Sequence, residues 1–242
     1  DQNDWEDKSF PNNELLSAAF PNQAVYLTRI DGHALLVNKK SLEKVGNLPI
    51  NIDGGEIIRE NGLPTGVFID EAMSLVNIPE LSEQFQTAGL QQAQANCFSM
   101  GLTGLADAGL PMSSILFLDS LQRAGVLKMP VYAMLSDDEN DNSKLFADGH
   151  FTSELIKVKS IKVYFDGALG SRGALLLESY SDYPGHFGLQ LKHREDLKNL
   201  CIVAKNKGIQ INVHAIGDSA NRMVLQVFAE VLEGKNNLRW RV

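Results

Sequence analysis

The sequence predicts an α/β protein organised around a parallel sheet, and three observations lead to that class. From residue 80 onward, short apolar runs alternate with segments of helical periodicity. These runs are hydrophobic along their length, as in strands buried on both faces of a parallel sheet. The 242 residues include 44% hydrophobic and 21% charged side chains, an ordinary globular balance that allows a sizeable core. An open doubly wound sheet and a (β/α)8 barrel both fit this pattern.

The part of the chain before residue 80 is less regular. The run "AVYLTRI" at 24–30 predicts a strand, and a short helix is expected from near Asn38 to Gly46, because glycine commonly ends helices. Residues 54–70 predict a hairpin with an Asn-Gly turn between two apolar runs. We interpret 31–79 as an insertion that carries small strands.

The rest of the chain predicts alternating strands and helices. A long helix is expected over 80–100, and Gly101 would end it. The following elements, in chain order, are a strand at 102–109, a helix at 113–125, strands at 130–138 and 160–167, a helix at 194–208, a strand at 209–218, a helix at 219–234 and a strand that begins at 238–242.

Charge and hydropathy exclude two classes of partner. The formal net charge of -8 leaves no basic stripe to neutralise phosphates, so we expect no nucleic-acid binding. No apolar run approaches the roughly 20 residues that span a bilayer, so we expect no membrane partner. The chain opens with Asp1 rather than Met, so we expect a preceding segment, where a secretion signal would lie. The compartment stays open, with the cytoplasm slightly favoured.

Acids and histidines follow the predicted strands. In both parallel architectures, the catalytic and ligand-binding residues lie at the carboxyl ends of the strands. Such side chains supply metal ligands and acid–base groups. The residues at these ends are Asp31, His33, Asp107, Asp137, Asp138, Asp166, His214 and Asp218.

Lys162 is the unusual member of the strand at 160–167. Strand alternation places Lys162 with Tyr164 and Asp166 on one face, and Ile161 with Val163 on the other. The lysine either reaches solvent from a frayed strand start or projects into a barrel mouth, where CO2 could carboxylate its amine to bridge two metals. The pattern alone favours neither interpretation.

His214 and Arg172 also have two interpretations each. A lone histidine at a strand end is more often structural than a ligand, although Asp218 in "HAIGD" could cap the next helix and fix the loop. The glycine-rich loop at 166–176 carries Arg172 at its tip. Its backbone amides and Arg172 could hold an anionic or carbonyl group, or the loop is only a flexible connection.

Six stretches together carry a family resemblance. They are "DGHALLVN", "GGEIIRENGLPTGVFIDEAM", "GLTGLADAG", "IKVYFDGALGSRGALL", "YPGHFGLQL" and "INVHAIGDSANRMVL". With these stretches in order, the chain resembles the YtcJ-like branch of the metal-dependent amidohydrolase superfamily, also called amidohydrolase family 3. The resemblance implies a (β/α)8 barrel of the TIM type. It also implies that metal-activated water hydrolyses a non-peptide C–N bond of a small molecule: an amide, an N-formyl or N-acyl group, or a cyclic amide.

The resemblance also assigns roles residue by residue. Lys162 resembles the metal-bridging, carboxylated lysine of the family, and His214 resembles the histidine of the fifth strand. Arg172 and His33 resemble residues near the substrate, and we add Asp166 and Asp218 to the predicted substrate contacts. The implied cofactor is a divalent metal, zinc in the first instance, with one or two ions.

This chain departs from the family pattern at both ends. It contains no His-x-His pair, and it ends at "RWRV", before the histidine of the sixth strand and the acid–base aspartate would follow. We therefore interpret 1–242 as a partial hydrolase barrel domain, with the first and last strands missing and 31–79 inserted. We expect this piece alone to be inactive and poorly metallated, with the catalytic residue outside it. Open sheet edges would make it a homo-oligomer.

Two other function classes stay open. The first is a lyase that uses Lys162 as a Schiff base, which borohydride trapping of substrate would favour. The second is a non-catalytic module for ligand binding or assembly, which the missing ligands make plausible. A longer reading frame with His-x-His upstream would reject that module.

Overall fold

The computed structural model describes residues 5–242, and contacts along the chain divide them into two compact units. The first, here called the antiparallel unit, contains the described residues up to Pro79, together with Tyr164–His193 and Ala215–Val224. The second, here called the parallel unit, contains Glu80–Val163, Arg194–His214 and Leu225–Val242.

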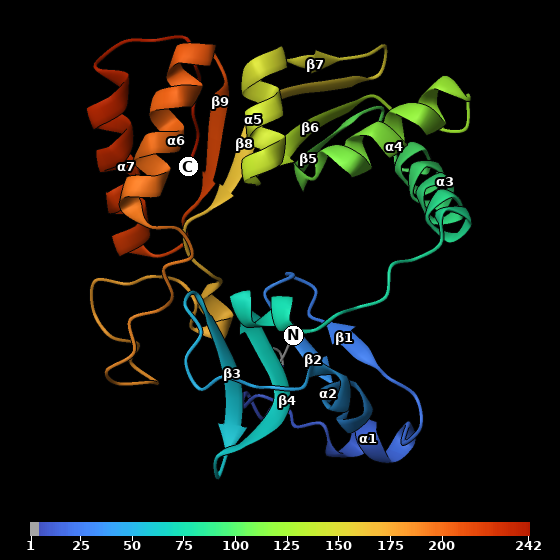
Figure 1. Cartoon of the computed structure of the whole chain (residues 1–242), viewed down its shortest axis with the longest axis vertical. Helices are drawn as coiled ribbons and strands as arrows, with labels where there is room; N and C mark the ends of the chain where they lie inside the picture. Colours follow the sequence, from blue (N-terminus) through green and yellow to red (C-terminus); the bar gives the residue numbers. More distant parts are fainter. Residues whose placement is uncertain (1–4) are drawn as a thin grey trace. The chain divides into compact units, whose positions relative to one another are not determined.

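The antiparallel unit is built on a sheet of four strands, β1 (Tyr26–Thr28), β2 (Ala34–Val37), β3 (Gly55–Glu60) and β4 (Leu63–Asp70). Their order is β1-β2-β4-β3 and all neighbours are antiparallel (Figure 1). The predicted hairpin is confirmed, because Asn61 and Gly62 link β3 to β4 with positive φ angles of 51° and 79°, as a tight hairpin turn requires.

Two helices accompany this sheet, α1 (Glu14–Ala19) and α2 (Lys39–Val45). The predicted helix near Asn38 is confirmed: the Asn38 side chain accepts a hydrogen bond from the Ser41 amide, and Gly46 follows the last turn. The sequence prediction missed α1 and treated β2 only as part of the insertion. The core of this unit contains Leu35, Val37, Ile57, Phe68, Ala72 and Val76.

The parallel unit contains the sheet that the sequence predicted. Strands β5 (Leu105–Leu110), β6 (Val131–Ser136) and β8 (Ile156–Tyr164) pair in that order, and both pairings are parallel. Strand β9 (Gln210–His214) also pairs with β8, and Figure 1 shows β8 and β9 side by side. The α/β class with a parallel sheet is therefore confirmed. Near the chain end, Arg241 forms a parallel bridge with Asn212, where a further strand was predicted.

The helices follow the predicted β-α order, with additions. They are α3 (Glu83–Ser99), α4 (Met112–Arg123), α5 (Glu139–Asp148), α6 (Arg194–Lys207) and α7 (Asp218–Leu232), with short 3-10 helices at Glu71–Leu75 and Leu169–Ser171. Within the described part of the chain, none of the helices has the length and apolar character needed to cross a membrane.

The sequence prediction missed α5 and the two-residue strand β7 (Phe151–Thr152), which pairs antiparallel with β8. Helix α5 is polar and is started by its cap: the Asp138 carboxylate accepts hydrogen bonds from the amides of Asn140 and Asp141. Asp138, interpreted from the sequence as a strand-end acid, therefore caps a helix.

Candidate functional site

Lys162 lies near the carboxyl end of β8, paired in register with Ser136 of β6. Its neighbours Ile161 and Val163 are fully buried, whereas Tyr164 is 45% exposed, so the predicted alternation is confirmed. This position is far from the start of the strand. The lysine therefore does not reach solvent from a frayed strand start, which was the structural alternative.

Burial changes the chemistry of the Lys162 amine. Desolvation lowers the pKa of Lys162 to about 8. A substantial fraction of the amine is then neutral in mildly alkaline solution, and the neutral amine is the form that reacts with CO2 or with a carbonyl group. The lowered pKa of Lys162 therefore favours both predicted roles of this lysine.

His214 is the last residue of β9, the strand that pairs with β8, and it is half-buried. Asn212 lies on the same face of β9 by strand alternation. Asn212 is only 5% exposed, and neither polar atom of its amide has a hydrogen-bond partner among the described residues. A buried amide of this kind normally forms hydrogen bonds with water or with a ligand. The face of β9 that carries Asn212 and His214 is therefore suited to bind a polar molecule.

The described residues do not make a complete metal site. Catalytic zinc usually takes three protein ligands. Across residues 5–242, no group of three or more His, Cys, Asp or Glu side chains is placed to hold a metal ion. His214 offers an imidazole nitrogen, and Lys162 would offer oxygens only if it were carboxylated, so a site that uses them needs further ligands.

Asp166 anchors two loops of the antiparallel unit. Its carboxylate is fully buried; Oδ1 accepts a hydrogen bond from the Ile216 amide at 2.9 Å, and Oδ2 accepts from the amides of Gly217 at 2.8 Å and Leu175 at 2.9 Å. The loop that follows β8 is thereby tied to the turn that follows β9. Both carboxylate oxygens are engaged by the backbone, and the predicted substrate contact of Asp166 stays a prediction.

Gly217 in this turn has no room for a side chain. A Cβ atom on Gly217 would lie 1.9 Å from the Leu175 carbonyl oxygen. Because that neighbour is backbone, Gly217→Ala is expected to lower the free energy of unfolding by about 2–3 kcal/mol. Gly89→Ala is the matched control: nothing lies within 4 Å of its added Cβ, and alanine favours the helix by about 0.5–1 kcal/mol. Urea unfolding of both variants tests this, and equal stabilities would contradict it.

Arg172 is held at the tip of the glycine-rich loop. Its guanidinium donates to Asp182 Oδ2 from Nε at 3.2 Å and from Nη2 at 3.0 Å, and it lies 5.7 Å from the centre of the Tyr183 ring. Hydrogen bonding to Arg172 lowers the pKa of the exposed Asp182. His186 Nε2 lies 2.7 Å from the Arg172 carbonyl oxygen. The loop is therefore braced rather than loosely connected.

Arg172 and Asp218 line one cavity of about 770 Å³ in the antiparallel unit. The Asp218 carboxylate accepts a hydrogen bond from the Leu177 amide at 2.9 Å, which fixes part of the wall. Tyr180 donates its hydroxyl to the Ala174 carbonyl, and burial raises the pKa of Tyr180 to about 12, so it remains protonated. Other lining residues include Leu169, Leu176, Glu178 and Ser181.

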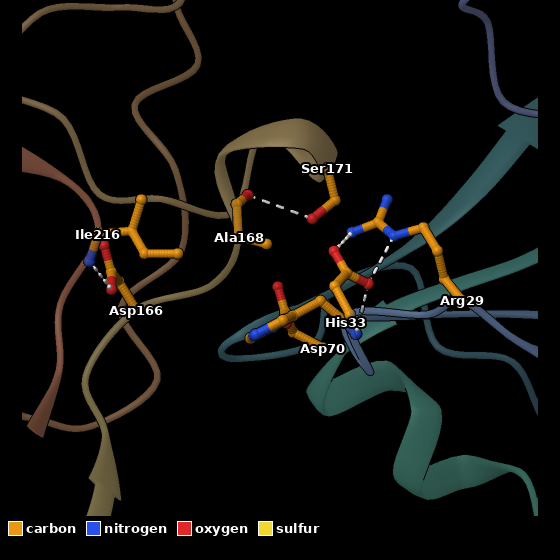
Figure 2. Close-up of polar contacts among 8 residues, drawn as sticks. Arg29, His33, Asp70, Asp166, Ala168, Ser171 and Ile216 are labelled. Carbon is orange, nitrogen blue, oxygen red and sulfur yellow. Dashed lines mark hydrogen bonds and ion pairs between the residues drawn. The ribbon is translucent and has the colours of Figure 1, made fainter. Parts of the chain in front are cut away.

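His33 pairs with a residue that the sequence analysis did not select. His33 Nδ1 lies 2.6 Å from Asp70 Oδ1, and Figure 2 shows the two side chains next to each other at the end of β4. The side chains are 13% and 2% exposed, respectively. The signal for Asp70 was present in the sequence, because it ends the apolar run "GVFI", but it stood inside the region interpreted as an insertion.

The six predicted site residues divide between the two units. Lys162 and His214 lie in the parallel unit, on neighbouring strands. The four predicted substrate contacts lie in the antiparallel unit: His33, Asp166, Arg172 and Asp218. Within that unit, Arg172 and Asp218 share a cavity, and Asp166 holds the turn that leads into Asp218.

The chain is similar to known proteins along its whole length. A family model described as the amidohydrolase family matches residues 1–242. The Arabidopsis thaliana protein LONG AFTER FAR-RED 3 is 30% identical over 260 residues, which cover 99% of this chain and 44% of that protein. The Bacillus subtilis protein YtcJ is named as an amidohydrolase. It is 31% identical over 238 residues, which cover 93% of this chain and 44% of YtcJ.

A third relative and two solved structures are also similar. The N-substituted formamide deformylase of Arthrobacter pascens is 23% identical over 93% of this chain and 44% of that enzyme. Crystal structures of uncharacterized metal-dependent hydrolases from Pyrococcus horikoshii and Pyrococcus furiosus superpose with TM-scores of 0.66 and 0.64, at 27% and 28% identity. The superposed regions make up 95% and 96% of this chain, and 46% and 48% of the chains in those two structures. The chain spans about half the length of the relatives that it matches.

Proposed function

Because the chain belongs to the amidohydrolase family, in its YtcJ-like branch, we propose that it is an internal part of a longer metal-dependent hydrolase that cleaves non-peptide C–N bonds. The substrate would be a small amide, an N-formyl or N-acyl compound, or a cyclic amide. The observation that carries the proposal is Lys162, a lysine near the end of a parallel strand whose pKa is lowered to about 8 by burial. The name of the Arthrobacter pascens relative, a formamide deformylase, supports the N-formyl class.

In this proposal Lys162 and His214 supply part of a divalent metal site, with zinc as the first candidate. A metal held there would lower the pKa of bound water and polarise the scissile carbonyl. The residues of this chain would contribute ligand atoms: a carboxylated Lys162 would offer oxygens, and His214 an imidazole nitrogen. The remaining ligands would come from the parent protein outside this chain.

We propose that the parallel sheet is part of a (β/α)8 barrel in which 1–242 forms one partial domain and 31–79 an inserted sub-region. Support comes from β5, the strand at one edge of the described sheet, where Leu105 is 41% exposed. Helix α3 has no buried residue, although it carries Phe85 and Phe98. Apolar surfaces of this kind favour covering by further strands or by a second copy, so we expect this chain alone to self-associate.

We propose that the cavity beside Arg172 and Asp218 binds a polar group of a small-molecule ligand. Arg172 presents a fixed guanidinium there, because Asp182 and the Tyr183 ring hold it. A guanidinium recognises carboxylate or carbonyl oxygens through its N–H groups. Asp218 on the same wall offers an acceptor for N–H or O–H groups.

Metal content and hydrolysis, measured side by side, test this function. We expect one or two equivalents of zinc in the parent protein and almost none in this chain, with release of formate from N-formyl substrates by the parent alone. The measurements are elemental analysis and a formate assay. A parent free of metal, or hydrolysis by this chain alone, would contradict the proposal.

The lowered pKa of Lys162 also favours a second candidate function. A desolvated amine forms Schiff bases with carbonyl substrates, so the parent could be a lyase. Borohydride reduction with candidate keto substrates separates the two functions. A covalent adduct on Lys162 favours the lyase, whereas a carboxylated Lys162 in a crystal structure of the parent excludes it.

A further inference from the structure

We propose that Asp70 is a positioning residue that keeps the proton of His33 on Nδ1, so that Nε2 is the basic nitrogen of the neutral ring, the one that can accept a proton or a hydrogen bond. The sequence patterns and the family resemblance gave Asp70 no role. The part of the inference that concerns substrate rests on the proposed function. The part that concerns the imidazole proton rests on geometry within the antiparallel unit and can be measured without any substrate.

The contact between the two side chains is close and shielded from water. His33 Nδ1 and Asp70 Oδ1 are 2.6 Å apart, and the Asp70 side chain is only 2% exposed. A carboxylate at this distance accepts the Nδ1 proton, whether the imidazole is neutral or charged. The backbone reinforces the pair, because the Asp70 amide donates to the His33 carbonyl oxygen at 3.3 Å.

The backbone of Asp70 is held in an unusual conformation. Its φ of 46° lies in the left-handed region, which non-glycine residues seldom adopt. Such conformations persist where the surrounding structure fixes them, and they are frequent at functional sites. The register of β4 against β2 fixes the approach of this residue, because Ile69 pairs with Ala34, the residue next to His33.

The position of the second carboxylate oxygen of Asp70, Oδ2, explains why two positions of the loop "DGALGSRGALL" are glycines. A Cβ atom on Gly167 would lie 2.2 Å from Asp70 Oδ2, and one on Gly173 would lie 2.6 Å from it. The loop backbone therefore closes directly over the carboxylate. Asp70 Oδ2 is buried and has no hydrogen-bond partner among the described residues. Nothing but glycine at both positions leaves room for the carboxylate that faces His33.

This enclosure predicts how an amide would behave at the same position in Asp70→Asn. If the new amide kept its oxygen toward His33, its NH2 group would lie against the two glycines, in the position where Asp70 Oδ2 has no hydrogen-bond partner, and a buried donor that finds no acceptor is costly. If the amide is flipped, its NH2 donates to His33 Nδ1 and the imidazole must carry its proton on Nε2. Asp70→Asn is therefore expected to reverse the protonation of the ring.

The test is ¹⁵N NMR of the two imidazole nitrogens of His33 in this chain. We expect a pyrrole-type Nδ1 in the native chain and a pyridine-type Nδ1 in neutral Asp70→Asn. Asp31→Asn is the matched control, because the Asp31 carboxylate accepts from the His33 backbone amide, and it should keep the native pattern. A pyridine-type Nδ1 in the native chain would overturn the inference without any variant, and so would an unchanged Nδ1 in Asp70→Asn.

Activity of the parent protein separates this inference from the proposed function. Loss of a residue that orients a site group typically costs about 10–100-fold, so Asp70→Asn should lower kcat/KM by that factor with unchanged metal content. If the native parent hydrolyses no C–N substrate, the proposed function fails and the NMR result still stands. If the ring reverses but kcat/KM is unchanged, His33 does not meet the substrate through Nε2, and the substrate half of the inference is wrong.

Discussion

Replacing Lys162 by methionine is expected to make this chain more stable and to impair strongly the hydrolysis proposed for the parent protein. The lysine is half-buried near the end of β8, and desolvation lowers its pKa from 10.5 to about 8. At pH 7 the folded chain must hold a cation in a site that disfavours charge. Methionine fills similar space without that charge. After a discount for partial exposure, the expected gain in the free energy of unfolding is about 1 kcal/mol.

The pH dependence gives this prediction a definite sign. The folded pKa of Lys162 lies below the unfolded one, so between about pH 8 and 10.5 the unfolded chain binds more protons than the folded chain. The stability of the native chain therefore rises relative to Lys162→Met across this window. The advantage of the variant is complete below pH 8 and disappears near pH 10.5. Urea unfolding of both proteins at several pH values gives the difference directly.

The matched control for this experiment is Lys159→Met, an exposed lysine on the same strand. Its replacement should leave both stability and activity nearly unchanged. In the parent protein, by contrast, loss of the lysine proposed to bridge metals should lower kcat/KM by on the order of 10³-fold, more than the effect of residues that only orient ligands. If Lys162→Met is no more stable than Lys159→Met and retains activity, Lys162 is an ordinary strand residue.

The sequence predicted well those features that depend on neighbours along the chain. The alternation around Lys162, the Asn61–Gly62 turn and the helix capped by Asn38 are each decided within a few residues. Local chemistry determines them, so a single sequence suffices. Helix α5 was missed because its sequence is polar and its start depends on the Asp138 cap more than on an apolar stripe.

Pairings between distant segments could not be predicted in the same way. His33 and Asp70 are 37 residues apart, and Asp166 and Gly217 are 51 residues apart. Asp70 and Asp166 each follow a short apolar run in the sequence, but only Asp166 was predicted as a site residue. The structure distinguishes them by their partners: an imidazole for Asp70, and backbone amides for Asp166. Burial and partner type, which decide the role of a carboxylate, follow from the tertiary fold.

Asp166→Asn is expected to cause the largest loss of stability among the substitutions considered. The buried carboxylate accepts three backbone hydrogen bonds, two of them on Oδ2. An asparagine oxygen can take the place of only one carboxylate oxygen, so its NH2 group must face at least one amide N–H. Two buried donors then lack acceptors, and hydrogen bonds to a charged group are lost. The expected cost in the free energy of unfolding is about 3–4 kcal/mol.

Two measurements distinguish this anchoring role from a general effect of the substitution. Urea unfolding should show the loss for Asp166→Asn but little change for Asp182→Asn, because Asp182 is exposed and forms a surface ion pair with Arg172. Amide hydrogen exchange should accelerate at Leu175, Ile216 and Gly217, the three donors to Asp166. If both variants unfold alike and these amides stay protected, other contacts hold the loops. A stability loss with faster exchange at these amides would mean that Asp166 acts by fixing the turn that leads into Asp218.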